Sequence, residues 1–147
     1  MAPRIGELLI KEKRITVAQL QEALIYQKVH GGRLGMNLVK LGFIKDEEIL
    51  GLLSNIYGVA SINLARYEIS PDVLRLIRGE TANRYQIVPL TKRGTTLTIA
   101  TTDPSNQYAL DDLKFLTGFE VEPILASDAA MVDAIAKYYP SAPADSV

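Results

Sequence analysis

The chain of 147 residues has no cysteine and only one histidine, His30. Without cysteine there is neither a disulfide framework nor a thiolate metal site, and one histidine excludes sites that need a pair. No apolar run approaches the roughly 18 residues of a membrane-spanning helix. The first four residues, Met-Ala-Pro-Arg, lack the apolar core of a secretion signal. We therefore expect a cytoplasmic protein that does not insert into a membrane itself.

Catalytic signatures are missing as well. The sequence contains no Gly-x-x-x-x-Gly-Lys-Ser/Thr phosphate loop and no Gly-x-Ser-x-Gly element. Asp111 and Asp112 are adjacent, and neighbours on a helix point about 100° apart, so we expect a solvated face and not a shared acid site. His30 is expected to be a cation at a helix C-terminus. The prediction is no enzyme, no catalytic residues and no metal in this chain; an ATPase domain could follow residue 147 in a longer protein.

Charge is nearly balanced overall but unevenly divided along the chain. The formal net charge is −1, which argues against DNA or RNA as a partner. Residues 1–58 carry eight basic and six acidic side chains, a net charge of +2, whereas residues 59–147 carry eight and eleven, a net charge of −3. The first part is therefore the better place for an anionic ligand.

The most informative stretch is an internal repeat with an offset of 29 residues. Arg4-Ile5-Gly6 returns as Arg33-Leu34-Gly35, and the match continues downstream. A solenoid generally needs about three copies to bury its own face, so two copies suggest a paired site or a small bundle. The matching downstream pairs are Ile15 and Ile44, Leu20 and Ile49, and Leu24 and Leu53.

Helical periodicity and end signals predict two helix pairs in this repeat. Thr16 and Gln19 have the spacing of a capping box, and glycines follow at the expected helix ends. The second long helix opens with three acidic residues, which suit the positive end of its dipole. The expected helices are 6–12, 17–30, 33–41 and 46–56.

The second half alternates helices with β-rich runs. A turn at Arg93-Gly94 predicts a hairpin between the first two strands, and Pro123 favours an edge position for the third. We predict an α+β fold: an N-terminal helical lobe (1–58), then a small α/β sandwich (59–140) with a three-stranded, mostly antiparallel sheet, and a disordered tail (141–147). The expected elements are an extended segment or short strand at 59–64, helices at 71–77, 106–116 and 128–139, and strands at 85–89, 95–101 and 120–126.

The doubled Arg-x-Gly suits a phosphate or a guanine. A helix N-terminus offers free N–H groups and partial positive charge, glycine permits close approach to the backbone, and arginine forks onto phosphate or the N7/O6 edge of guanine. A plainer interpretation remains open beside it. A tandem helical hairpin needs leucines for its core and glycines for its turns whether or not it binds anything.

The repeated pattern resembles the N-terminal, MshEN-type domain of type II secretion and type IV pilus assembly ATPases, in which the doubled motif binds cyclic di-GMP. The resemblance covers about residues 4–139. The first copy reads Arg4, Ile5, Gly6, Leu9, Lys13, Leu20, Leu24, Gln27; the second reads Arg33, Leu34, Gly35, Leu38, Gly42, Ile49, Leu53, Ile56.

The resemblance implies a regulatory module for cyclic di-GMP, with no other cofactor. Arg4 and Arg33 would meet guanines or phosphates, Gly6 and Gly35 would give backbone access, and Gln27 a polar contact. The implied apolar walls are Leu9, Leu20, Leu24, Leu34, Leu38, Ile49 and Leu53, with Ile5 and Gly42 completing the implied set. The partners would be the ATPase domain and an inner-membrane platform protein. The alternative is a domain that docks on the platform or a motor component, with the nucleotide site degenerate.

Two positions depart from the family pattern. Lys13 replaces a glycine, and a non-glycine residue takes the left-handed conformation at a cost of about 1–2 kcal/mol. Ile56 replaces a glutamine, which removes one amide; a ligand atom buried without that partner would cost about 1–3 kcal/mol. A weakened site and a lost site are both compatible with these changes.

Overall fold

The structure is a computed structural model that describes residues 5–140. Two units separate between Leu52 and Leu53, six residues before the sequence-based boundary at residue 58. The division falls inside a helix, because the last helix of the repeat continues without a break into the second unit. Arg4 and the tail 141–147 lie outside the described residues.

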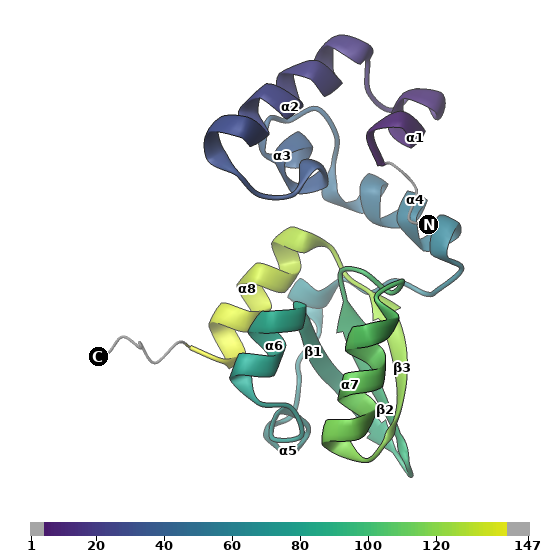
Figure 1. Ribbon diagram of the computed structural model, residues 1–147, viewed down its shortest axis with the longest axis vertical. Coiled ribbons are helices and arrows are strands. Elements are labelled where there is room, and N and C mark those ends of the chain that lie inside the picture. Colours follow the sequence, from purple (N-terminus) through teal and green to yellow (C-terminus); the bar gives the residue numbers. More distant parts are fainter. Residues whose placement is uncertain (1–4, 141–147) are drawn as a thin grey trace. The chain divides into compact units, whose positions relative to one another are not determined.

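The first unit is helical and has the predicted alternation of short and long helices (Figure 1). The helices are α1 (Ile5–Lys11), α2 (Val17–His30), α3 (Leu34–Lys40) and α4 (Asp46–Tyr57). The capping box is confirmed: the Gln19 N–H donates to Thr16 Oγ1, and the Thr16 N–H donates to Gln19 Oε1. Gly31, with φ of +75°, ends α2 as predicted.

Two pairs of equivalent residues in the repeat copies have the same burial. Leu9 and Leu38 are both 0% exposed, and Ile15 and Ile44 are both 6% exposed. The repeat is therefore structural, since each copy contributes the same two side chains to the interior of this unit.

The second unit confirms the α+β class. Its elements are η1 (Leu64–Arg66), α5 (Pro71–Leu74), α6 (Gly79–Tyr85), β1 (Ile87–Arg93), β2 (Thr96–Thr101), α7 (Gln107–Thr117), β3 (Glu120–Leu125) and α8 (Asp128–Tyr138). The helix expected at 71–77 ends at Leu74, and α6 was not foreseen. Gln86, in the left-handed conformation with φ of +55°, ends α6 and delays the first strand to Ile87.

The sheet has the order β1-β2-β3 and is mixed, with one pair of each kind, where the sequence suggested mostly antiparallel pairing. β1 and β2 form the predicted antiparallel hairpin, whose turn contains Gly94 at φ of +57°. β2 and β3 are parallel because α7 lies between them and returns the chain to the end where β2 began. Pro123 lies on an edge strand, as predicted.

Both faces of the sheet are covered by helices (Figure 1). Val88, Leu90 and Ala100 pack with η1 and α8 on one face, and Ile87, Leu97 and Ile99 pack with α6 and α7 on the other. The segment 59–64 is largely extended and adds one parallel bridge, Ser61 to Leu125. The first four residues of β1 are buried, which agrees with the apolar start of that strand, whereas β3 has exposed glutamates at Glu120 and Glu122.

Candidate functional site

Gly6 of the first repeated motif lies next to Leu34 of the second in the helical unit. α1 packs against α3. A Cβ added at Gly6 would lie 3.3 Å from Leu34 Cδ2, so the glycine of the first copy adjoins the leucine that precedes the glycine of the second. The paired arrangement that the repeat suggested is therefore present.

Each glycine also faces the long helix of its own copy. The added Cβ of Gly6 would lie 2.7 Å from Leu20 Cδ1, and that of Gly35 would lie 3.7 Å from Ile49 Cδ1. Leu20 and Ile49 are repeat equivalents. Gly6 is buried by this packing, so in this structure it allows close helix contact and does not give the backbone access that was expected; Gly35 is more open.

Arg33 and the loop between the two copies are the polar neighbours of these glycines. Arg33 precedes α3 with extended backbone, φ −86° and ψ 150°, and its side chain is exposed. Gln27 Nε2 donates to the Gly32 carbonyl at 2.9 Å, and Asn37 Nδ2 donates to the Gly31 carbonyl at 3.0 Å. One N–H of the Gln27 amide is therefore used within the chain, which leaves its Oε1 and its second N–H for a ligand.

Asn37 was not identified from the sequence. It is 1% exposed on the inner face of α3, between Leu34 and Leu38. The available signal was a polar residue on an otherwise apolar helical stripe. Its amide holds the glycine loop that leads to Arg33, so it acts as a positioning residue for this part of the site.

The expected apolar walls divide into two groups by burial. Leu9 and Leu38 are fully buried and Ile49 is 7% exposed, so these three side chains hold the unit together in this structure. Ile5, Leu20 and Leu34 are partly buried and Leu24 is 40% exposed, which makes them the accessible apolar surface. Leu53 follows the division within α4 and is not part of the first unit.

The turns after α1 and α3 are equivalent in conformation. Lys13 has φ of +61° and Gly42 has φ of +79°, which confirms that Lys13 takes the left-handed conformation. Gly42 is exposed with nothing near its Cβ position, so in this structure it serves as a helix end.

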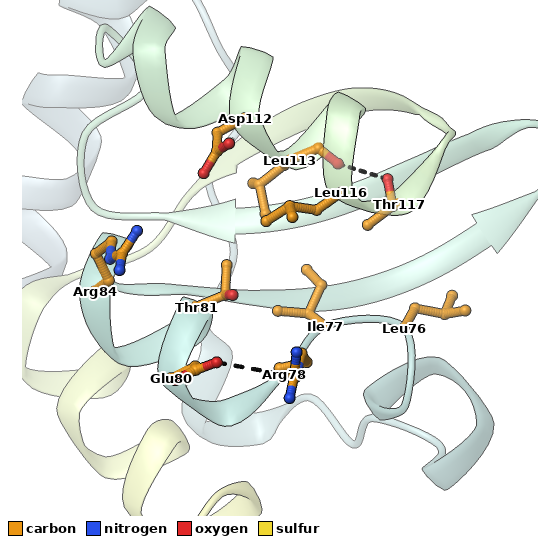
Figure 2. Close-up of a pocket in the computed structure, with 10 residues that line it drawn as sticks. All are labelled: Leu76, Ile77, Arg78, Glu80, Thr81, Arg84, Asp112, Leu113, Leu116 and Thr117. Atoms are coloured by element: carbon orange, nitrogen blue, oxygen red, sulfur yellow. Dashed lines mark hydrogen bonds and ion pairs between the residues drawn. The ribbon is translucent and has the colours of Figure 1, made fainter.

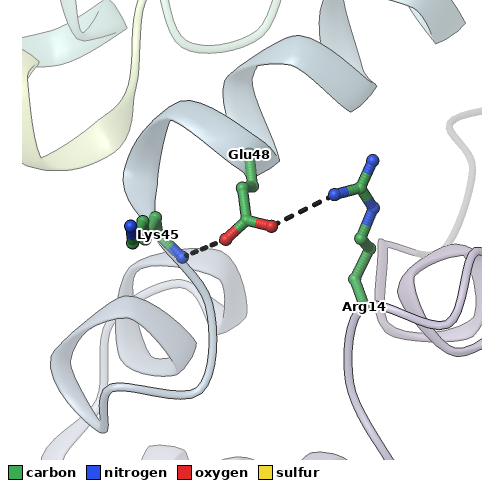
Figure 3. A network of polar contacts seen from close by, with 3 residues as sticks. All are labelled: Arg14, Lys45 and Glu48. Atoms are coloured by element: carbon green, nitrogen blue, oxygen red, sulfur yellow. Dashed lines mark hydrogen bonds and ion pairs between the residues drawn. The ribbon is translucent and has the colours of Figure 1, made fainter.

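An ion pair joins the turn of the first copy to the second long helix (Figure 3). Arg14 Nη1 lies 3.1 Å from Glu48 Oε2, and the Lys45 N–H donates to Glu48 Oε1 at 3.1 Å. Lys45 and Glu48 are the repeat equivalents of Thr16 and Gln19, so half of the capping box is kept. Both charged side chains are more than one third exposed, so the pair contributes about 0–1 kcal/mol.

The second unit contains a separate pocket of about 430 Å³ between α6 and α7 (Figure 2). Leu113 and Leu116 of α7 face Ile77 and Thr81 across it, and Arg84 and Asp112 lie at one end. The Tyr85 hydroxyl donates to Asp112 Oδ2 at 2.6 Å, and this hydrogen bond, followed by desolvation, raises the pKa of Tyr85. Its residues come from distant segments, so no sequence motif marked the pocket.

The acid pair does not share a site, as predicted, and His30 lies at a helix C-terminus, as predicted. Asp111 accepts from Gln107 Nε2 and Asp112 from Tyr85, so the two carboxylates serve different neighbours. His30 is the last residue of α2, with its ring centroid 4.1 Å from that of Tyr26. Across the described residues, no three histidine, aspartate or glutamate side chains gather into a group that could bind a metal. Within residues 5–140, no helix has the length and apolar content that crossing a membrane requires.

Comparison with known proteins identifies the kind of domain. The N-terminal domain of XpsE has the same fold, with a TM-score of 0.67 at 18% identity, over 95% of this chain and 99% of that one. The family model described as the MshEN domain matches residues 35–145. The chain therefore belongs to the MshEN domain family.

More similar relatives agree with this assignment. The type IV pilus assembly ATPase PilB of Myxococcus xanthus is 42% identical over 139 residues, which are 95% of this chain and 25% of PilB. PilB of Thermus thermophilus is 30% identical over 93% of this chain and 16% of its own length. A solved structure described as MshE with cdg is 32% identical, with a TM-score of 0.69, over 94% of this chain and 100% of that one. The chain spans a quarter or less of these two curated relatives.

Proposed function

We propose that this chain is a cyclic di-GMP-binding regulatory module of a type II secretion or type IV pilus assembly ATPase and works in the cytoplasm. One observation carries the proposal: Gly6 of the first motif copy lies against Leu34 of the second. The solved MshE structure, whose ligand cdg we read as cyclic di-GMP, shares 32% identity with this chain and is covered over its whole length.

A duplicated site suits the chemistry of this ligand. Cyclic di-GMP has two guanines and two phosphates related by two-fold symmetry, so each copy of the motif would meet one half. Arg33 is exposed beside the glycine loop and would stack on a base or fork onto a phosphate, with Arg4 as its sequence equivalent. Leu20, Leu24 and Leu34 supply apolar contact, and Gln27 Oε1 would accept from a guanine N–H.

The buried members of the motif have a supporting part in this proposal. Leu9, Leu38 and Ile49 fix the positions of the four helices, and Asn37 fixes the loop that leads to Arg33. Gly6 lies under Leu20 and Leu34, whose methyl groups would have to rotate for a ligand to reach the backbone there. The more open surface at Gly35 is therefore the better first contact.

Regulation would follow from ligand-dependent stabilisation of the helical unit. A ligand that binds only the folded form at 100 times its Kd stabilises that form by about 2.7 kcal/mol. α4 is one continuous helix whose last residues belong to the second unit. Ligand binding that stabilises the start of α4 would therefore also stabilise the helical conformation of these last residues. The catalytic part of the ATPase is proposed to lie elsewhere in a longer protein.

Calorimetry tests this function directly. Cyclic di-GMP is titrated into the wild-type chain, Arg33→Ala and Arg4→Ala, with GMP as a ligand control. Loss of a charge-assisted hydrogen bond, about 1.5–3 kcal/mol, should weaken binding by roughly 10- to 100-fold in either variant. Arg75→Ala is the matched control, because Arg75 is an exposed arginine of the second unit that pairs with Asp72. Absence of wild-type heat, or equal affinity in Arg33→Ala, would refute the proposal.

A second candidate is docking on a partner protein, such as the inner-membrane platform, and α7 favours it. Tyr108, Phe115 and Leu116 are 73%, 85% and 57% exposed, an unusual set of large apolar side chains on one surface helix. A Phe115→Ser/Leu116→Ser variant should lose at least half of its capture by the purified cytoplasmic part of the platform protein, whereas Arg33→Ala should not. Unchanged capture by the double variant would remove α7 from consideration.

A further inference from the structure

The pocket between α6 and α7 has two unlike walls (Figure 2). Along α6 the lining side chains are Arg78, Thr81 and Arg84, which recur every third residue and so follow one side of the helix. The wall from α7 is apolar: Leu113 is fully buried at its base, and Leu116 is 57% exposed. The pocket, called the α6–α7 groove below, is therefore polar along one side and apolar along the other.

The two arginines of this groove keep most of their hydrogen-bond donors free. Arg84 lies over the Tyr85 ring, with Cζ 5.9 Å from the ring centroid, and has no carboxylate within ion-pair distance among the described residues. Arg78 has only Glu80, whose Oε1 is 4.0 Å from Arg78 Nε, and the two side chains are 84% and 78% exposed. An exposed pair at that distance is weak and leaves both terminal nitrogens of Arg78 free. The groove thus offers two guanidinium groups from positions about 9 Å apart along the helix axis.

Two carboxylates also line the groove, but neither occupies the arginines. Asp112 lies at the Arg84 end (Figure 2), and its Oδ2 accepts from the Tyr85 hydroxyl at 2.6 Å. Glu80 is the exposed, distant partner of Arg78 described above. A carboxylate that approaches from solvent can therefore reach both guanidinium groups, whose planar fork matches its two oxygens.

We propose that the α6–α7 groove binds an amphipathic helix of another protein, in which acidic residues border the apolar stripe. The apolar stripe covers Leu116 and enters the pocket of about 430 Å³, and the acidic border lies along Arg78 and Arg84. Acidic residues seven positions apart lie on one side of a helix and about 10 Å apart. This spacing matches the separation of the two arginines.

The groove favours a helix over other occupants. An extended peptide is bound through backbone hydrogen bonds at a sheet edge, and two helices offer none, because their N–H and C=O groups pair within each helix. A fatty acid has its charge at one end and would leave one arginine without a partner. Nothing in this contact requires nucleotide binding in the helical unit.

Fluorescence anisotropy of the whole chain with a labelled model peptide tests the groove. The probe is a helical peptide of about 18 residues with leucines on one stripe and glutamates along its border. A control peptide has lysines in place of the glutamates. Residues 59–147 carry a net charge of −3, which by itself favours the lysine peptide. The glutamate peptide should nevertheless bind at least about 10-fold more tightly, because only it pairs with the two arginines.

Single substitutions locate the contact. Arg78→Ala and Arg84→Ala should each weaken binding of the glutamate peptide by about 3- to 10-fold, and Leu116→Ser by roughly 5- to 10-fold. Arg75→Ala is the matched arginine control, because Arg75 pairs with Asp72 and does not line the groove. Phe115→Ser is the apolar control, because Phe115 is exposed on the same helix but lies outside the lining. Neither control should change binding.

Charge reversal gives the decisive result. The Arg78→Glu/Arg84→Glu variant should lose the glutamate peptide and bind the lysine peptide more tightly than wild type does, whereas Arg33→Ala should bind both as wild type does. Circular dichroism checks that every variant is folded. No saturable binding of the glutamate peptide, equal affinity for the two peptides, or no exchange of preference on charge reversal would each overturn the proposal. Dodecanoate binding without peptide binding, or self-association that Leu116→Ser abolishes, would assign the groove to a lipid carboxylate or a second copy and also overturn it.

Discussion

Lys13 and Gly42 have the same left-handed backbone in equivalent turns, with φ of +61° and +79°. The hydrogen bonds that close the two turns also match: Arg14 N–H to the Leu9 carbonyl at 2.8 Å and Phe43 N–H to the Leu38 carbonyl at 3.0 Å. The packing of Leu9 and Leu38 in the interior fixes this geometry in both copies. In the first copy, Lys13 therefore adopts a φ angle that is unfavourable for a residue with a Cβ atom.

The first prediction concerns these two turns. The left-handed angle costs a non-glycine residue about 1–2 kcal/mol. A glycine avoids this cost but lowers the free energy of unfolding by about 0.4–1 kcal/mol, because it raises the entropy of the unfolded chain. Lys13→Gly should therefore raise the free energy of unfolding by about 0.5–1 kcal/mol, and Gly42→Ala should lower it by a similar amount. Urea unfolding followed by circular dichroism measures both.

Gly51 provides the matched control for this prediction. It lies in α4 with a negative φ and nothing within 4 Å of its Cβ position, so Gly51→Ala should stabilise by about 0.5–1 kcal/mol. The same chemical change would then have opposite signs at positions 42 and 51. Equal signs at both would mean that the turn angle is not the cause.

The second prediction separates the two motif glycines. A Cβ at Gly6 would meet Leu20 Cδ1 at 2.7 Å, whereas a Cβ at Gly35 would meet Ile49 at an ordinary 3.7 Å. Gly6→Ala should destabilise by about 1 kcal/mol, since overpacking costs about 1–3 kcal/mol and helix propensity returns part of it. Gly35→Ala should be neutral or stabilising. Thermal unfolding compares the two, and a Gly6→Ala/Leu20→Val double variant should recover part of the loss. No difference between the glycines would show that Leu20 yields freely.

The helices of the first unit could be predicted well from the sequence, because both copies of the repeat place equivalent apolar residues in the interior. Matching residues such as Ile15 and Ile44 have equal burial, and the capping box at Thr16 formed as expected. The sequence did not predict the contact of Gly6 with Leu20, because glycine occurs both where a ligand reaches the backbone and where helices pack closely. The parallel pairing of β2 with β3 was also missed, because strand direction depends on the path of α7 and not on the strand residues.

The third prediction concerns Asn37, whose hydrogen bond to the Gly31 carbonyl could not be predicted from the repeat. The equivalent residue in the first copy is Leu8, which has no polar side chain. Asn37→Ala leaves the Gly31 carbonyl without the amide donor and opens a small cavity, so the free energy of unfolding should fall by about 2 kcal/mol. Asn55→Ala, on the exposed side of α4, should change it by less than about 0.5 kcal/mol. Chemical denaturation of the two variants compares them, and a small effect at Asn37 would mean that water replaces the amide.

The fourth prediction is an alkaline loss of stability through Tyr139. Its hydroxyl oxygen lies 3.0 Å from the Leu74 carbonyl oxygen and 2.9 Å from that of Ile77, so its one hydrogen is donated to these two acceptors. Burial raises the pKa of Tyr139 from 10.0 to about 12. Ionisation removes the donor and sets a negative oxygen against two carbonyls. Because the folded-state pKa is the higher one, this contribution to stability is complete below pH 10 and is lost as pH rises toward 12.

Tyr139→Phe isolates this contribution. Below pH 10 the variant should be less stable than wild type by about 1 kcal/mol, the net value of one hydrogen bond, and the difference should shrink as pH approaches 12 because wild type loses what the variant never had. Urea unfolding at intervals from pH 8 to pH 12 measures the difference, in which the other titrating groups cancel. Tyr108→Phe, 73% exposed on α7, should show little difference throughout. A difference in unfolding free energy between wild type and Tyr139→Phe that stays constant up to pH 12 would mean that the Tyr139 hydroxyl remains protonated. No difference at any pH would mean that its two carbonyl contacts contribute no stability.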